Sequence, residues 1–372
     1  MSGTVGNNAG RGSGVIATAA AGDITKSTSE PATDTNPSGG VGTVWLRTTT
    51  GEMYCCTDAT TDENVWTNVG AGTGNITPWA FTDGGKISIY TMGGNMTSSR
   101  SAKIEKIAIA SDGDSTDVAV LTAVNHGWGG CSSETHGYSC GGSNGEWGSG
   151  PFNNRIEKFE FASDGDATDI ADMTVTMMNR SGHSTETHGY NCGGQDGGAV
   201  NSVDVIDRFS FASDGDSSNV GDLLQIRSLI GSSSGVDYGF CAGGESTPGD
   251  TNTIQRFQFA SSADSTDVGN LINSLQTPCG HTGGTSYGFT SGGNTNVIQR
   301  YAFASSGDAS DWGDLTWTVH HGGGSESTDY GYVMGGYPLS NVIQKFAFES
   351  ASDATDVGDL QESKGATANA HN

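Results

Sequence analysis

Positive charge is scarce in this sequence. Of its 372 residues only 16 are Lys or Arg, against 42 Asp or Glu, which gives a formal net charge of −26. Nucleic acids and anionic membranes are bound through basic surfaces, so this balance argues against both as partners. No apolar run approaches the roughly 18 residues of a membrane span, and the start of the chain has no basic segment followed by an apolar one. We expect neither membrane insertion nor a secretory signal.

Hydrophobic residues are also sparse, at 33%, whereas Gly is abundant, with 59 copies. Such a composition favours many short strands and turns over long amphipathic helices. The seven cysteines are an odd number and form no CxxC pair. Their spacing argues against both a disulfide framework and a zinc site, and we interpret them as free thiols packed within strands.

A repeat organises most of the chain. Six segments of the type "GYSCGG" end in Gly-Gly, and their first glycines lie 43 to 52 residues apart: Gly93, Gly141, Gly193, Gly243, Gly292 and Gly335. Each is followed by a strand-like phrase such as "IEKFEFASDGDATD", starting at Ile104, Ile156, Ile206, Ile254, Ile298 and Ile343. Six copies at this period are typical of a β-propeller with one four-stranded sheet per copy.

The pattern within one copy gives a strand order. In the third copy we expect strands in "RSGHSTETHG", "YNCGG" and "VIDRFSF", and in the stretch from Val220 to Ile226. The acidic phrase between the last two strands is a turn, because short Asp and Ser side chains bond their own backbone. The C-terminal residues 365–372 align with a first strand, so we expect them to complete the sheet that contains Ile87–Met92 and to close the ring.

The repeats resemble those of kelch-type β-propellers over about residues 80–372. The resemblance rests on the Gly-Gly segments, the aromatic strands that follow, and an "R-x-G-H-S" motif formed by Arg180, Gly182, His183 and Ser184. Kelch repeats prefer Trp after the turn, and only Trp312 fits here. The resemblance implies an all-β fold, a six-bladed kelch-like propeller closed by the C-terminal strand.

The N-terminal residues differ from the repeats. We expect residues 1–38 to form an extended anchoring arm, 39–75 a small β-hairpin attachment module turning at 49–51, and 76–372 the propeller. The module ("GTVW…TTTGE…CTD…VW") and the "FASDGDATD" repeats resemble structural proteins of tailed, chiefly marine, bacteriophages. That resemblance implies a virion protein, assembled in the host cytoplasm and exposed on the particle.

Two functions are consistent with a phage particle. One is a receptor-binding or tail-fibre component that contacts a host surface glycan or protein. The other is a capsid or tail decoration protein with a purely structural role. In both cases the arm and module would hold other virion proteins, and the chain would form a homo-oligomer. A cellular adhesin is disfavoured by the lack of a secretion signal.

We find no catalytic motif. His136, His188 and His371 share one repeat position, and neither a copper-oxidase set of Cys, Tyr and His nor a glycosidase carboxylate pair stands out. We therefore expect no enzyme and no cofactor, with Ca²⁺ as the open alternative. Its candidate ligands have a D-x-D-x-x-D spacing in two of the acidic turns: Asp112, Asp114, Asp117, Asp164, Asp166 and Asp169.

Each repeat also carries Lys or Arg in the strand before the acidic turn, and we expect these cations to neutralise carboxylates within a sheet or in its neighbour. The connections at the other end vary in length and carry aromatic residues. Exposed aromatic side chains on a rigid scaffold are common binding anchors, although they also cap cores. The residues predicted to bind a receptor are His126, Trp128, Trp147, Phe152 and Tyr337.

Overall fold

A computed structural model describes residues 24–70, 86–127, 129–145, 150–195, 202–246 and 249–372. The chain forms two compact units, Met1–Pro78 and Trp79–Asn372. The described residues are all-β, with turns between the strands. Within this part of the chain no helix has the length and apolar character needed to cross a membrane.

The N-terminal unit contains one four-stranded sheet, in the order β1 (Ile24–Ser27), β2 (Val44–Arg47), β3 (Met53–Asp58) and β4 (Val65–Gly70). β2 and β3 form the expected hairpin, and Gly51 adopts φ 75° in its turn. β1 pairs in parallel with β2, so the sheet begins before the expected boundary at residue 39. The expected arm is therefore wrong for residues 24–38, whose backbone carbonyls accept hydrogen bonds from Trp45 and Asn64. Residues 1–23 lie outside the described part.

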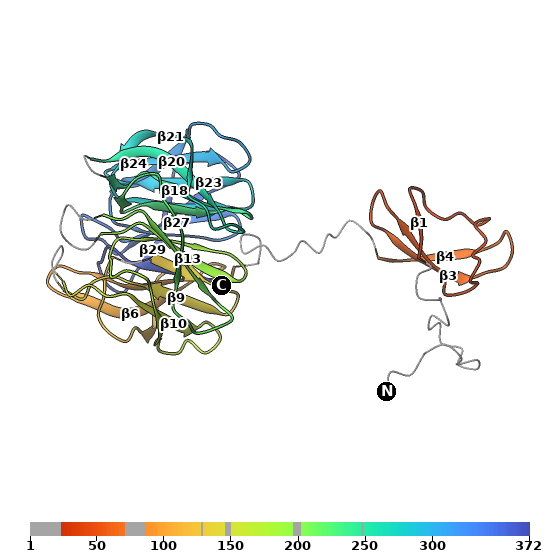
Figure 1. Ribbon diagram of the computed structural model, residues 1–372, viewed down its shortest axis with the longest axis horizontal. Helices are drawn as coiled ribbons and strands as arrows, with labels where there is room; N and C mark the ends of the chain where they lie inside the picture. Colours follow the sequence, from red (N-terminus) through yellow and green to blue (C-terminus); the bar gives the residue numbers. More distant parts are fainter. Residues whose placement is uncertain (1–23, 71–85, 128, 146–149, 196–201, 247–248) are drawn as a thin grey trace. The chain divides into compact units, whose positions relative to one another are not determined.

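The second unit contains six four-stranded antiparallel sheets among its described residues (Figure 1). The first three, in spatial order, are β30 (Ala368–His371), β5 (Ser88–Asn95), β6 (Arg100–Ala108), β7 (Thr116–Val120); then β8 (Gly129–Ser132), β9 (His136–Cys140), β10 (Arg155–Glu160), β11 (Thr168–Asp172); and then β12 (Ser181–Ser184), β13 (His188–Cys192), β14 (Val205–Ser210), β15 (Ser218–Asp222).

The fourth to sixth sheets follow the same order of strands. They are β17 (Gly231–Ser234), β18 (Tyr238–Ala242), β20 (Thr251–Gln258), β21 (Thr266–Leu275); then β22 (Pro278–Gly283), β23 (Tyr287–Gly292), β24 (Thr295–Ala302), β25 (Ser310–Val319); and then β26 (Gly323–Glu326), β27 (Tyr330–Met334), β28 (Val342–Ala347), β29 (Thr355–Asp359). A two-stranded ribbon pairs β16 (Arg227–Ser228) with β19 (Glu245–Ser246). The strand order expected for the third copy is confirmed.

The C-terminal strand lies where the sequence predicted. β30 pairs with β5, with Ala370 opposite Tyr90. We call the first strand of each sheet in spatial order the inner strand and the last one the outer strand. The inner strands contact one another in a cyclic order, β8, β12, β17, β22, β26, β30 and again β8. β30 thus belongs to both its own sheet and this cycle.

Hydrogen bonds and small residues hold the inner strands together. The Ser132 amide donates to the Ser184 hydroxyl, and the Ser184 amide donates to that of Ser234. The His371 amide donates in the same way to Ser132, which joins the two ends of the repeat region. A Cβ at Gly182 would lie 2.0 Å from the carbonyl oxygen of Gly130, so the backbones approach too closely there for any side chain.

Aromatic side chains fill the space between neighbouring sheets. In five interfaces an aromatic residue of the second strand packs on the last residue of an "F-x-F" or "Y-x-F" segment, which directly follows the third strand of the next sheet: Tyr90 on Phe161, Tyr138 on Phe211, Tyr190 on Phe259, Phe240 on Phe303 and Phe289 on Phe348. The ring centroids lie 4.5–4.9 Å apart. At the sixth interface Tyr332 packs with Ile107 and Ile109. The repeated phrase is therefore a sheet-to-sheet packing unit.

Candidate functional site

The acidic turns join neighbouring sheets. In all six, the second Asp accepts a hydrogen bond of 2.9–3.1 Å from a backbone amide in the outer strand of the preceding sheet: Asp114 from Asp359, Asp166 from Val120, Asp216 from Asp172, Asp264 from Asp222, Asp308 from Asn270 and Asp353 from Asp314. A carboxylate is a strong acceptor for a backbone amide. This aspartate thus provides a hydrogen-bond acceptor for a backbone amide at the edge of each outer strand.

The first Asp of the turn pairs with a lysine of the preceding sheet. Lys106 lies 2.9 Å from Asp164, and equivalent pairs join Lys158 to Asp214 and Lys345 to Asp112. The predicted neutralisation between neighbouring sheets is confirmed for these three lysines.

The other three sheets replace both partners together. Their acidic turns have Ser262, Ser306 and Ala351 in place of the first Asp, and the preceding sheets have Arg208, Arg256 and Arg300 in place of Lys. Arg256 lies over the ring of Tyr238 and Arg300 over the ring of Trp312, at 4.5 and 3.8 Å from the ring centroids. A planar guanidinium suits an aromatic face, whereas a compact ammonium suits a carboxylate.

Five of the six calcium candidates make these or similar contacts. Asp112 and Asp164 pair with lysines, Asp114 and Asp166 bind backbone amides, and Asp117 lies 3.5 Å from Lys103 Nζ. The sixth candidate, Asp169, lies opposite Glu157 in the pairing of β10 with β11. Among the described residues, one group of three potential ligands gathers within 4.8 Å, and none of its members lies in an acidic turn.

A second polar position lies deep between the sheets. Residues of the third strands that are no more than 1% exposed accept hydrogen bonds from the preceding sheet: Glu105, Glu157, Asp207, Gln255, Gln299 and Gln344. Two of the three acids have a buried cation, with Lys364 2.7 Å from Glu105 and Arg180 2.9 Å from Asp207. Burial lowers the pKa of Lys364, and the nearby Glu105 carboxylate partly offsets this shift. Sequence reasoning missed this position.

The predicted receptor anchors are placed unequally. His126 is completely buried, so its prediction as a surface anchor is wrong. Tyr337 is half-buried, stacks on His320 with centroids 5.6 Å apart, and accepts a hydrogen bond from the Asn95 side chain. Phe152 is half-buried and its backbone bridges to Ser143. The remaining two, Trp128 and Trp147, lie outside the described residues.

Histidines gather near Tyr337. His320 and His321 approach through their Nδ1 atoms at 2.8 Å. Burial, followed by the positive charge of Arg100, lowers the pKa of His126 to about 4. Burial and the neighbouring His320 and His126 lower the pKa of His321 to about 3. At neutral pH this cluster is therefore uncharged.

The inner strands surround two small polar cavities. One, of about 130 Å³, is lined by residues that precede or begin the inner strands, including Asn179, Thr277 and His321. The other, of about 60 Å³, is lined further along the same strands by Ser132, His183 and Glu326, among others. Both cavities are large enough to hold water molecules.

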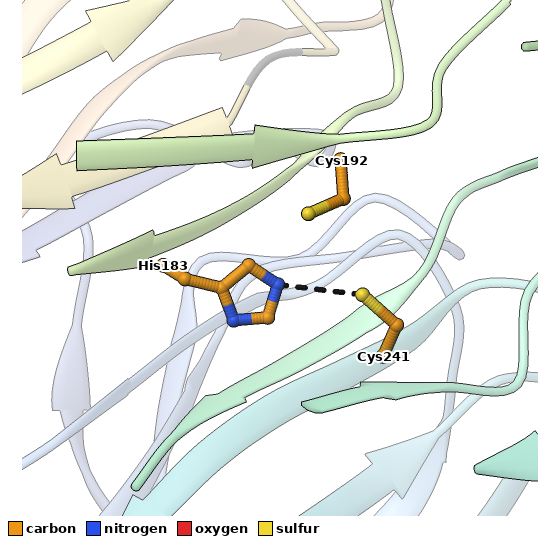
Figure 2. Close-up of side chains that lie close together, drawn as sticks. All are labelled: His183, Cys192 and Cys241. Atoms are coloured by element: carbon orange, nitrogen blue, oxygen red, sulfur yellow. Dashed lines mark hydrogen bonds between the residues drawn. The ribbon is translucent and has the colours of Figure 1, made fainter. Parts of the chain in front are cut away.

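One buried group combines an imidazole with two thiols. His183, Cys192 and Cys241 point toward a common space between the third and fourth sheets, and His183 Nε2 lies 3.4 Å from Cys241 Sγ (Figure 2). The Cys192 thiol, His183 and Arg227 lower the pKa of Cys241. Burial raises the pKa of Cys192. All seven cysteines are free, as predicted, and six of them are buried.

No family model matches the chain. No curated protein matches it either. Its function therefore has to be argued from the fold and the contacts above.

Proposed function

We propose that the six sheets are the blades of a closed six-bladed β-propeller. The cyclic contacts of the inner strands support this, as does the pairing of β30 with β5. The repeated Asp–amide contacts support it too, because they run from each sheet to the one before it and from the first sheet to the sixth. Closure in this way removes sheet edges that would otherwise be exposed.

The chain then serves as a binding module of a tailed-phage particle, a receptor-binding or tail-fibre component rather than an enzyme. The observation that carries this proposal is the difference between the two ends of the ring. At one end the acidic turns use their aspartates in nearly identical inter-sheet contacts. At the other end the connections from second to third strands range from the long 141–154 to the short 293–294.

Connections that differ from sheet to sheet at one end of a rigid scaffold favour recognition at that end. The polypeptide enters β5 at the acidic-turn end, since antiparallel strands alternate direction. In this proposal the N-terminal unit attaches to other virion proteins, and the variable end of the ring binds a host surface glycan or protein. The phage assignment itself comes from the sequence resemblance.

The test measures adsorption by particles that carry altered chains. Trp147→Ala with Phe152→Ala changes the variable end, and Tyr287→Ala with Tyr330→Ala is the matched control at the acidic-turn end, where both tyrosines are 38% exposed. We expect slower adsorption for the first pair, unchanged adsorption for the control, and equal incorporation of both. Equal adsorption by all particles, with antibody against the chain labelling the capsid or tail tube, would favour the decoration role instead.

A further inference from the structure

The His183, Cys192 and Cys241 group is assembled from three strands. His183 lies on β12 and Cys192 on β13, both in the third sheet, while Cys241 lies on β18 in the fourth. Their residues are at most 2% exposed, and their donor atoms all lie within 4.8 Å of one another. The group thus spans an interface between two sheets that have no covalent link there.

The imidazole is oriented toward the thiols by its other nitrogen. His183 Nδ1 lies 3.1 Å from the carbonyl oxygen of Ser233, which can only accept, so Nδ1 carries the proton. The lone pair of Nε2 therefore faces Cys241 Sγ. The ring also packs edge-on against Phe257, with centroids 5.2 Å apart. A histidine anchored by a backbone carbonyl at one nitrogen is the usual arrangement of a metal ligand.

The same positions in two other interfaces provide an internal comparison. His281 has the orientation of His183, with Nδ1 3.0 Å from the Ser325 carbonyl oxygen, but its Nε2 meets the hydroxyl of Ser291 at 2.9 Å. Between the second and third sheets the positions hold Cys131, Cys140 and Asn191. The histidine orientation is thus a feature of the repeat, and among these three interfaces one alone adds two thiols to it.

We propose that His183, Cys192 and Cys241 bind one Zn²⁺ ion that joins the third and fourth sheets. Sulfur and imidazole nitrogen are the ligands that Zn²⁺ prefers, and two ligands at about 2.3 and about 2.0 Å from a tetrahedral ion lie about 3.5 Å apart. The Nε2–Sγ separation of 3.4 Å fits this geometry. Two thiolates also balance the charge of the ion, so the buried complex is neutral.

A fourth donor and an access route are both close. Ser181 Oγ lies 3.5 Å from His183 Nε2 and 3.8 Å from Cys241 Sγ, so its hydroxyl can approach the ion. The cavity of about 60 Å³ between the inner strands reaches His183. The site has no open face for a substrate, so its role is structural. This inference does not depend on the proposed attachment function.

The experiment uses the full chain, stripped of metal by a chelator under reducing conditions and then titrated with ZnCl₂ or CoCl₂. After removal of unbound ions, we expect one Zn²⁺ per chain by mass spectrometry of the metal. We also expect a thiolate-to-cobalt charge-transfer absorption with Co²⁺, and a higher melting temperature with Zn²⁺. Absence of the cobalt band in the unaltered chain would overturn the proposal without relying on any variant.

Matched double variants locate the site. Cys192→Ser with Cys241→Ser should lose the ion, the cobalt band and the thermal shift. Cys131→Ser with Cys140→Ser removes two buried thiols that take the places of His183 and Cys192 one interface away, and this variant should keep all three. Retention of Zn²⁺ by the first pair, or its loss from the second, would show that the ion binds elsewhere. Binding of Cu⁺ but not Zn²⁺ would overturn the choice of ion.

Discussion

Replacing Lys364 by leucine tests how the sixth sheet is joined to the first. Lys364 lies 2.7 Å from Glu105, and both side chains are fully buried. The Glu105 carboxylate also accepts hydrogen bonds from the Ser115 hydroxyl and the Gln361 amide. Lys364→Leu leaves these two donors but removes the positive charge, so a carboxylate remains buried without its ion pair. Breaking a buried ion pair from one side costs about 3–5 kcal/mol of unfolding free energy.

The protein itself contains the uncharged version of this contact. In the fifth sheet Gln299 takes the place of Glu105. Leu275 takes the place of Lys364, because the backbone carbonyl of each accepts a hydrogen bond from the second amide of a Gly-Gly pair. Glu105→Gln with Lys364→Leu should therefore recover most of the stability lost by either single change. The gain reflects the lower cost of burying an amide than a lone charge.

Calorimetry of the wild type, both single variants and the double variant forms a double-mutant cycle. For a unit of this size about 1 kcal/mol corresponds to roughly 2–4 °C, so each single variant should melt roughly 10 °C lower. The double variant should melt within a few degrees of wild type on the same scale. The reasoning is refuted if Lys364→Leu is nearly neutral, or if the two losses simply add.

Three further predictions concern the turns, the histidines and the inner strands. Asp166→Ala removes one amide acceptor at the surface, so calorimetry should show a loss of about 1 kcal/mol, and added Ca²⁺ should not change the melting temperature of the wild type. The pKa of His126 is lowered from 6.5 to about 4 in the folded protein, so unfolding takes up a proton between these pH values and the unfolding free energy decreases as the pH is lowered from 6.5 toward 4. At pH 5 this loss should be about 2 kcal/mol, and His126→Gln should reduce the slope of melting temperature against pH. Gly182→Ala brings a Cβ against the Gly130 carbonyl and should cost about 2 kcal/mol or more, whereas Gly215→Ala, whose Cβ meets nothing within 4 Å, should be nearly neutral in chemical unfolding.

The strands were predictable because their signals are local and repeated. Alternating apolar residues, Gly-Gly ends and acidic turns recur in each copy, and the C-terminal residues could be aligned with a first strand. The parallel strand β1 was missed because "ITKS" is short and mostly polar and pairs with a segment some 20 residues away. Its position depends on tertiary pairing that no local pattern in residues 24–27 announces.

The contacts between sheets were less accessible from the sequence. The first and second Asp of an acidic turn look alike, and only the register between neighbouring sheets gives one a lysine and the other a backbone amide. Gly127 and Trp128 follow His126 and predict a loop anchor, yet the fold buries this histidine. The two thiols of the proposed zinc site lie 49 residues apart, so no zinc-binding spacing could reveal them. For the ion pairs between neighbouring sheets, the sequence does carry one signal. Where the first Asp of an acidic turn is replaced by Ser or Ala, the Lys of the preceding sheet is replaced by Arg.

Closure of the ring by β30 is tested most directly by amide hydrogen exchange in the full-length protein. β30 pairs with β5 and contacts both β8 and β26, so its amides should exchange as slowly as those of β5 and through the same cooperative opening. Exchange of β30 at the rate of an unstructured segment, while β5 stays protected, would contradict a closed ring.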